Sequence, residues 1–259
     1  LKVPGKSLPM LAALLAAKGK VPEGMNIWRQ VSSPADLRAN TRNFVNSLLA
    51  VRAWGSAFEV WKNAPRLPNP NAAQMDQDAL DEDTQWFTYH QPDQGSELSN
   101  GDFEADLRSR NSAPFLDWKV GAIQGLSISR DSEQKKSGNV SLRVTFDVPG
   151  NAAFSVIEQT VPVVAGAKYV LSYISRTENM MSLSTPLIEV YDPADTSKLR
   201  IASKPLPLNT TQWEETKLDF TVPSGTEMVV VRLLRPACGE PPCPIIGKVW
   251  IDGIRLVRQ

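Results

Sequence analysis

The spacing of hydrophobic residues changes along the chain from a helical period to a strand-like one. Up to residue 65, apolar side chains recur at helical spacing, for example Leu48, Leu49, Phe58 and Trp61. From residue 98 onward, short segments rich in β-branched and aromatic residues are separated by Gly, Pro, Asn and Asp. The pattern therefore predicts an all-α domain at residues 1–65 and an all-β domain at residues 98–259.

The helical domain contains an internal repeat. The stretch LAALLAAKGKVPEGMNIWRQ at residues 11–30 aligns without gaps to FVNSLLAVRAWGSAFEVWKN at residues 44–63, an offset of 33 residues. The matched positions are Leu15 with Leu48, Gly24 with Ala57, Met25 with Phe58, and Trp28 with Trp61. Each unit is expected to form a helical hairpin with its small residue where the helices cross, and SSPADLRAN between the units contains a Ser-Pro helix start.

Hairpins of this length resemble tetratricopeptide repeats (TPR), which implies an all-α TPR-like domain of two hairpins. The Gly-Tyr pair that is usual in the first helix of that repeat is missing, so a generic helical bundle is the alternative. Because each repeat buries one face on its neighbour, two units rarely suffice alone. We therefore expect further repeats before residue 1.

Residues 66–97 have the composition of a linker. The segment begins with turn-forming, proline-rich sequence and contains DQDALDED at residues 76–83. This acidic run lacks the central Gly and terminal Glu of an EF-hand loop, so it is interpreted as solvated chain. The aromatic patch TQWFTYH at residues 84–90 is expected to fill the joint between the domains.

The all-β domain is predicted to be an antiparallel β-sandwich of the jelly-roll type, because about ten short strands follow one another without a helix between them. The predicted strands are FLDWKVG, LSISR, VSLRVTFD, AFSVIEQTVPV, KYVLSYISRT, LIEVYD, RIASKPLPL, WEETKLDFTV, EMVVVRLLRP and KVWIDGIRLV.

A series of motifs in this domain resembles carbohydrate-binding modules of the family 4, 9 and 22 type. In order, the motifs are SNGDFE at 99–104, Trp118, SGNVSLRV at 137–144, IEQTVPV at 157–163, AGAKYVLSYISRT at 165–177, TQWEETKLDFTVP at 211–223 and VWIDGIRLV at 249–257. The resemblance implies a galactose-binding-like jelly roll and a polysaccharide ligand, although one fold hosts many functions.

The order of helical repeats, linker and sandwich resembles the C-terminal region of bacterial tetratricopeptide proteins found with exopolysaccharide or cell-surface export systems. That resemblance implies a non-catalytic adaptor in a periplasmic or cell-surface location, with an export signal before residue 1. The alternative is a scaffold in which the repeats and the sandwich both contact protein partners, without glycan binding. The scaffold would show a flat apolar patch near Trp28, Trp54 and Trp61.

Strand alternation suggests which side chains could bind a glycan. One face is predicted to carry the candidate ligand-binding residues Gln159, Arg176, Glu189, Tyr191 and Arg232. An aromatic ring among charged and amide groups suits a sugar, whose faces stack on rings and whose hydroxyl groups need hydrogen-bond partners. The alternative is a set of cross-strand ion pairs with a purely structural role.

Glu104 and Asp252 are a candidate structural metal site. The first and last strands are neighbours in the fold that the chain resembles, so these carboxylates are expected to lie close together and to repel each other unless neutralised. The resemblance implies calcium, which prefers hard oxygen ligands. Pairing with a basic side chain such as Lys248 or Arg255 is the alternative, and IDG in place of the commoner Asp-Asp pair removes one carboxylate.

Cys238 and Cys243, in CGEPPC, are expected to form a small disulfide loop, which would indicate an oxidising, extracytoplasmic compartment. Two reduced thiols in a surface loop are the alternative. Two cysteines and the distant His90 cannot supply the four ligands of a zinc site.

Charge and composition exclude several functions. The chain has 28 basic and 28 acidic side chains and no basic run, so it lacks the electrostatic footprint of a nucleic-acid-binding protein. Its most apolar stretch, LPMLAALLAA, is about half the length of a transmembrane helix. There is no Gly-x-Ser-x-Gly elbow or phosphate-binding loop, and the single histidine, His90, is on the linker. We therefore do not expect an enzyme.

Overall fold

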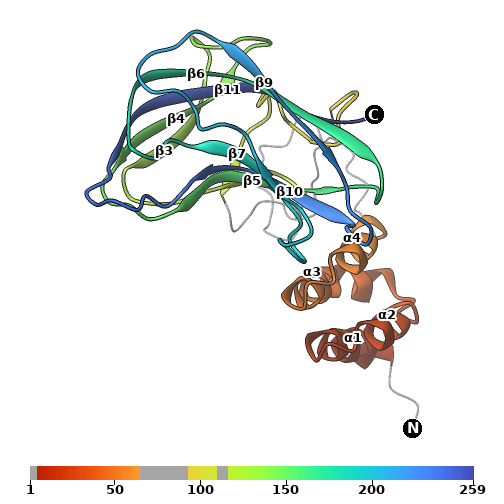
Figure 1. The fold of residues 1–259 in the computed structure, drawn as a ribbon. Coiled ribbons are helices and arrows are strands. Elements are labelled where there is room, and N and C mark those ends of the chain that lie inside the picture. The colour runs from red at the N-terminus through yellow and green to blue at the C-terminus, as the bar shows by residue number, and fades with distance from the viewer. Residues whose placement is uncertain (1–4, 65–92, 110–115) are drawn as a thin grey trace. The chain divides into compact units, whose positions relative to one another are not determined.

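The computed structural model describes residues 5–64, 93–109 and 116–259. The chain divides into two compact units, Leu1–Phe87 and Thr88–Gln259. Within the described residues, the first unit is helical and the second is a β-sandwich (Figure 1). Most of the predicted linker, including its acidic run at 76–83 and its aromatic patch at 84–90, lies outside the described residues.

The described part of the helical unit, residues 5–64, contains four α-helices in two consecutive pairs. After a short 3-10 helix, η1 (Gly5–Ser7), come α1 (Leu8–Ala17), α2 (Val21–Trp28), α3 (Pro34–Ala50) and α4 (Trp54–Lys62). We call α1 and α2 the first helix pair, and α3 and α4 the second helix pair. Helix α1 packs against both α2 and α3, and α3 packs against α4.

Local sequence explains where these helices begin and how closely they approach. The hydroxyl of Ser33 accepts a hydrogen bond from the Asp36 backbone N–H (3.2 Å), and Pro34 occupies the first helical position of α3, as the Ser-Pro start predicted. Gly24 of α2 packs against α1, and a Cβ atom at this position would be 3.0 Å from the Ala12 carbonyl oxygen. A small residue at the helix crossing is therefore a packing requirement.

The sandwich consists of two sheets, as the strand pattern predicted. The six-stranded sheet has the order β1 (Arg108–Ser109), β2 (Lys119–Val120), β5 (Phe154–Pro162), β10 (Met228–Arg235), β7 (Leu187–Tyr191), β8 (Arg200–Ala202). The five-stranded sheet has the order β3 (Leu126–Asp131), β4 (Ser141–Val148), β11 (Ile245–Arg258), β6 (Lys168–Met181), β9 (Glu214–Thr221). All neighbouring strands pair antiparallel except β1 and β2, which pair parallel.

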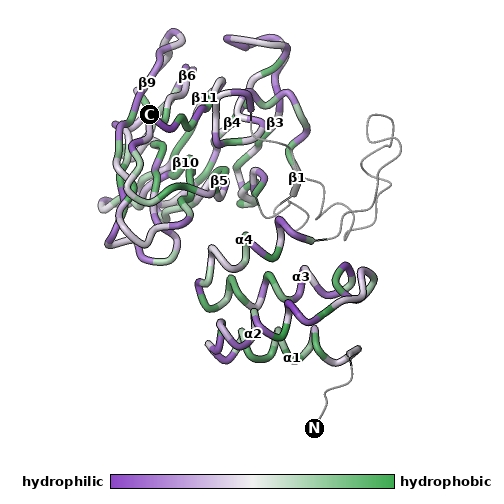
Figure 2. Tube along the Cα trace, turned by 90° about the vertical axis from the view of Figure 1, so that its right-hand side faces the viewer, coloured by the Kyte–Doolittle hydropathy of each residue, from purple (hydrophilic) through white to green (hydrophobic). Residues whose placement is uncertain are grey.

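The core lies between the two sheets and is formed by alternate residues of their strands. On β6, Tyr169, Leu171 and Tyr173 are buried in this core, as alternation predicted. In Figure 2 the strands of the sandwich carry a mixture of hydrophobic and hydrophilic residues. Val170 and Ser172, which lie between the buried residues of β6, face away from the core and are half-buried, and a ligand site on a sheet must use such positions.

Candidate functional site

The motif SNGDFE builds a tight turn that fixes the start of the sandwich against β11. Asn100 and Phe103 both have positive φ, at 50° and 59°. A Cβ atom on Gly101 would lie 1.9 Å from the Ile254 carbonyl oxygen, so only glycine fits. Phe103 packs on Trp118, whose indole N–H donates to the Asn100 carbonyl oxygen (3.0 Å). This motif is therefore structural.

A charged cluster spans β10, β7 and the edge strand β8 of the six-stranded sheet. Glu189 on β7 is opposite Arg232 on β10, and its carboxylate accepts hydrogen bonds from Nε of Arg232 and Nε of Arg200, both at 2.7 Å. The guanidinium carbon of Arg232 lies 4.6 Å from the centre of the Tyr191 ring. We call these four residues, Glu189, Tyr191, Arg200 and Arg232, the Glu189 cluster.

The Glu189 cluster stands on the outer face of its sheet. Its neighbours along the strands, Ile188, Val190 and Val231, are in the core, so the cluster points the other way. Glu189 is only 3% exposed, whereas the Arg200 side chain is 58% exposed. Two guanidinium groups share this single carboxylate. The arrangement can donate hydrogen bonds outward beside an aromatic ring.

The structure places Gln159 and Arg176 elsewhere, which corrects the predicted face. Gln159 is on β5 of the same sheet but points into the sandwich, where its amide bonds to the backbone N–H and C=O of Ser99 (3.1 and 3.0 Å). Arg176 is on β6, in the five-stranded sheet. Neither residue therefore shares a face with Glu189, Tyr191 and Arg232.

Arg176 belongs to a second cluster, on the outer face of the five-stranded sheet. Its guanidinium carbon lies 4.9 Å from the centre of the Trp250 ring and its side chain bonds to Gln134. The Trp250 indole donates to the Asp131 carboxylate (2.9 Å), which also pairs with Arg143 (3.2 Å). Trp250 itself is buried, so this cluster anchors the loop between β3 and β4 onto the sheet.

The pKa of Asp131 reflects two opposing effects. Burial alone would raise it, but the Trp250 indole N–H, the backbone N–H groups of Gln134 and Glu133 and the charge of Arg143 together outweigh burial. These contacts hold the pKa of Asp131 below its ordinary value. Asp131 is therefore an ionised anchor in the folded protein at neutral pH.

Glu104 and Asp252 bind the same loop, residues 136–140, through hydrogen bonds. Asp252 accepts from the backbone N–H groups of Lys136 and Ser137, both at 2.8 Å, and from the Ser137 hydroxyl (3.2 Å). Glu104 accepts hydrogen bonds from the backbone N–H and from the side-chain amide of Asn139. The backbone hydrogen bond is the largest cause that lowers the pKa of Glu104. Hydrogen-bond donors of one loop therefore stabilise both carboxylates.

This arrangement does not fit a calcium ion between Glu104 and Asp252. Calcium takes six to eight oxygen ligands, whereas the oxygens of this pair face N–H and O–H groups. Within residues 5–64, 93–109 and 116–259, no three His, Cys, Asp or Glu side chains lie close enough to share an ion. The basic alternatives also bind elsewhere: Lys248 bonds to Glu178 (2.8 Å), and Arg255 to the Gln94 carbonyl oxygen (3.3 Å). Calcium at this pair stays a prediction from the sequence resemblance.

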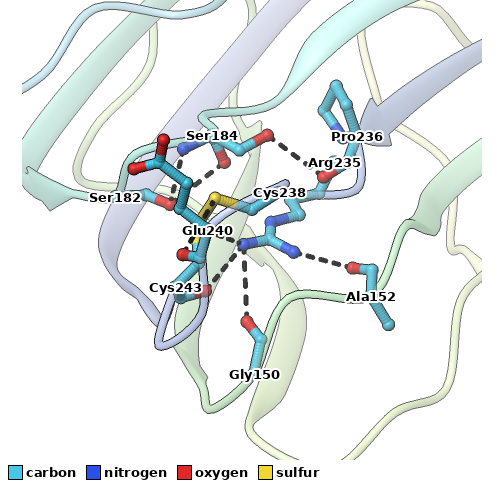
Figure 3. The surroundings of a disulfide bond; sticks show 9 residues. All are labelled: Gly150, Ala152, Ser182, Ser184, Arg235, Pro236, Cys238, Glu240 and Cys243. Carbon is cyan, nitrogen blue, oxygen red and sulfur yellow. Dashed lines mark hydrogen bonds between the residues drawn. A yellow bond between two sulfur atoms is a disulfide. The ribbon is translucent and has the colours of Figure 1, made fainter.

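Cys238 and Cys243 form a disulfide in the loop between β10 and β11 (Figure 3). Beside it, the buried guanidinium of Arg235 donates to the carbonyl oxygens of Ala152 and Cys243, both at 2.7 Å. Burial lowers the pKa of Arg235. Arg235 thus joins the disulfide loop to the segment that leads into β5, so this region is a structural clamp.

A pocket of about 360 Å³ lies away from the Glu189 cluster, where β11 bulges from β6. Its charged lining residues are Asp102, Glu215 and Arg255, and Ser172 and Ile174 of β6 contribute to the same wall. This pocket is the alternative location for a ligand, and experiments on the Glu189 cluster must distinguish the two.

Sequence reasoning missed Arg200, the most exposed member of the Glu189 cluster. It lies on β8, a strand of three residues, in which alternation cannot be recognised. Its place opposite Tyr191 follows from the pairing of β7 with β8. The only sequence signal was an arginine in a segment already expected to be a strand.

Comparisons with known proteins give structural neighbours only. No family model matches the chain, and no curated protein matches it. The solved structure "CBM4 structure and function" has a TM-score of 0.45 and 14% identity, covering 62% of this chain and 99% of that one. The C-terminal family 22 carbohydrate-binding module of Clostridium thermocellum Xyn10B has a TM-score of 0.40 and 16% identity, covering 64% and 96%.

A bacteriophage protein is also among the neighbours. The enzymatically active domain of bacteriophage CBA120 tailspike protein 4 has a TM-score of 0.46 and 15% identity, covering 64% of this chain and only 22% of that one. At these values, none of the neighbours carries information on the ligand or activity of this chain.

Proposed function

We propose that the β-sandwich binds carbohydrate through the Glu189 cluster and catalyses no reaction. The observation that carries this proposal is a buried carboxylate that holds two arginines from neighbouring strands, one of them over a tyrosine ring. The order of sequence motifs from 98 to 257 gives independent support, since it resembles that of carbohydrate-binding modules.

The cluster suits a sugar because its donors are held in place before a ligand arrives. Arg232 contacts one oxygen of Glu189 through both Nε (2.7 Å) and Nη2 (2.5 Å), so its guanidinium plane is fixed. Arg200 contacts the other oxygen through Nε, and its exposed side chain can offer further N–H groups to hydroxyl or carboxylate oxygens of a ligand. Preorganised groups lose less conformational entropy on binding.

The same contacts argue against catalysis at the cluster. A glycosidase uses one carboxyl group as an acid and a second carboxylate as a base or nucleophile. Both oxygens of Glu189 accept hydrogen bonds from arginines, so this carboxylate is committed to holding them. We therefore infer a binding module and not an active site.

The proposed setting is extracytoplasmic, where the Cys238–Cys243 disulfide would persist. Among the described residues, no helix is both long and apolar enough to cross a membrane. In this proposal the chain is an adaptor for a cell-surface or exported polysaccharide, and its helical unit contacts a protein.

Binding of the whole chain to a panel of neutral and acidic polysaccharides, measured by calorimetry, tests the proposal. Tyr191→Ala and Arg200→Ala should each weaken binding about tenfold, equivalent to ~1.4 kcal/mol. Arg143→Ala is the matched control, because it removes an arginine from an ion pair on the other sheet and should leave affinity unchanged.

Two results would overturn the assignment. A folded chain that binds no polysaccharide in the panel would reject carbohydrate binding. Binding that is lost in Glu215→Ala but retained in Tyr191→Ala and Arg200→Ala would place the ligand in the pocket beside β11.

A further inference from the structure

Helix α1 carries apolar side chains on a side that no described element covers completely. Met10 is 75% exposed and Leu14 is 55% exposed, and they are the large hydrophobic residues of the described helical unit that are most exposed. Leu8, Leu11 and Leu15 beside them are only half-buried. We call these five residues the α1 outer surface.

The 33-residue repeat shows what normally covers such positions. Leu8, Leu11 and Leu15 of the first helix pair correspond to Thr41, Phe44 and Leu48 of the second pair. The second set is completely buried, with 0% exposure, because α3 packs against α1 of the preceding pair. The Phe44 ring also stacks on Trp28 of that pair, with ring centres 4.6 Å apart. Equivalent positions are thus covered in one pair and open in the other.

The exposed positions of α1 are more apolar than the equivalent positions of the second helix pair. Met10 and Leu14 correspond to Asn43 and Ser47, which are polar, in the second pair. All ten residues of α1 are apolar, and Figure 2 shows the helix as predominantly hydrophobic. A helix that is hydrophobic all round is normally buried on all sides. The first pair therefore carries the composition of an internal member of a helical stack.

Of the three tryptophans near which the scaffold hypothesis predicted an apolar patch, Trp54 is half-buried. Trp28 is buried against Phe44, and Trp61 is also buried. Among the described residues of the helical unit, the exposed large apolar side chains are on α1. In a second copy of this chain, Trp28 and Trp61 would both be buried within that copy. Neither could therefore cover Leu11 in the way that Trp28 covers Phe44.

We propose that the α1 outer surface binds another helix pair of the same 33-residue kind, stacked on α1 as the second helix pair stacks on the first. This partner carries a bulky aromatic residue at the end of its second helix, in the place of Trp28, to contact Leu11. Its remaining apolar residues cover Leu8 and Leu15, and its edge lies along Met10 and Leu14. The interface continues the contact between α1 and α3 in the opposite direction.

The test adds a copy of residues 1–33 directly before residue 1 of the whole chain, which preserves the 33-residue spacing. Amide hydrogen exchange of α1 should slow by about tenfold, because a stacked neighbour suppresses local opening. The matched control is the same fusion with Trp28→Ala in the added copy only, which should lose most of that protection.

Two outcomes would overturn the proposal. In the first, α1 exchanges at the same rate in both fusions and in the original chain. In the second, the original chain dimerises in sedimentation and Met10→Lys with Leu14→Lys makes it monomeric, so that a second copy and not a separate helix pair covers α1. The polysaccharide measurements on the sandwich are independent of both outcomes.

Discussion

At the scale of single residues, two buried polar side chains in one sheet have opposite roles. Gln159 faces inward and Glu189 outward, and both are almost fully buried. Gln159 satisfies the backbone of Ser99, whereas Glu189 positions arginines on an outer face. Burial of a polar group therefore does not by itself indicate a ligand site. The role of such a group is indicated by the partners to which it bonds.

Replacing Gln159 by Ala should destabilise the sandwich by about 2–3 kcal/mol, because the N–H and C=O of Ser99 would lose their partner in a buried place. Urea unfolding measures this loss. Gln212→Ala is the control, since Gln212 is exposed and should change stability by less than about 0.5 kcal/mol. Equal effects of the two substitutions would contradict the role assigned to Gln159.

Asp131 should make stability fall in acid. Its pKa is lower in the folded protein than the ordinary 3.8, so its contribution is present above that pH and is lost as pH falls through the folded value. Asp131→Asn should therefore be less stable than the unmodified chain at neutral pH, and the gap should close as pH falls through the lowered pKa of Asp131. Denaturant unfolding measures the difference in stability between the two chains. A difference that persists in acid would show that the packing of the Asp131 side chain matters and its charge does not.

The sequence could predict the direction of the β7 side chains, but not that of Gln159 and not the partner strands. Alternation correctly put Glu189 and Tyr191 opposite Ile188 and Val190, because it depends only on the pleat of one strand. Whether β6 lies beside β7 depends on pairing between distant segments. For that reason Arg176 was assigned to the wrong face.

At the scale of secondary structure elements, strand ends depart from prediction where backbone hydrogen bonding changes. The predicted strand RIASKPLPL is a strand only over Arg200–Ala202, since Pro205 and Pro207 have no N–H to donate. The final strand is longer than predicted, Ile245–Arg258, and is irregular at two places where Gly247 and Gly253 have positive φ. The second irregularity lies next to Asp252 and creates the pocket wall.

The loop between β3 and β4 gives a prediction about calcium. Because Glu104 and Asp252 are already bonded to N–H groups of this loop, we expect the same unfolding temperature with excess calcium and with a chelator. An ion present at a hundred times its dissociation constant would stabilise the fold by about 2.7 kcal/mol. If calcium stabilises the unmodified chain by that amount but does not stabilise Glu104→Gln, the ion displaces the amide donors.

At the scale of the whole molecule, the two units differ in how their contacts span the sequence. Helices α1 to α4 pack mainly on neighbours in the chain, so the 33-residue repeat alone predicted the helical unit. The sandwich joins its beginning to its end: the Ile254 N–H donates to the Gly101 carbonyl oxygen (2.8 Å), and the Glu97 N–H to the Leu256 carbonyl oxygen (2.7 Å). Such long-range pairing is invisible to local patterns and was expected here only from the motif order.

The position of β11 has a consequence for synthesis on the ribosome. It is the last strand of the sandwich in sequence order, yet it is the middle strand of its sheet, between β4 and β6. Until Ile245–Arg258 has left the exit tunnel, β4 and β6 each expose an edge of unpaired N–H and C=O groups. The sandwich therefore completes its fold only after its own translation, and in that interval the nascent chain is most exposed to chaperones and to pairing with other chains.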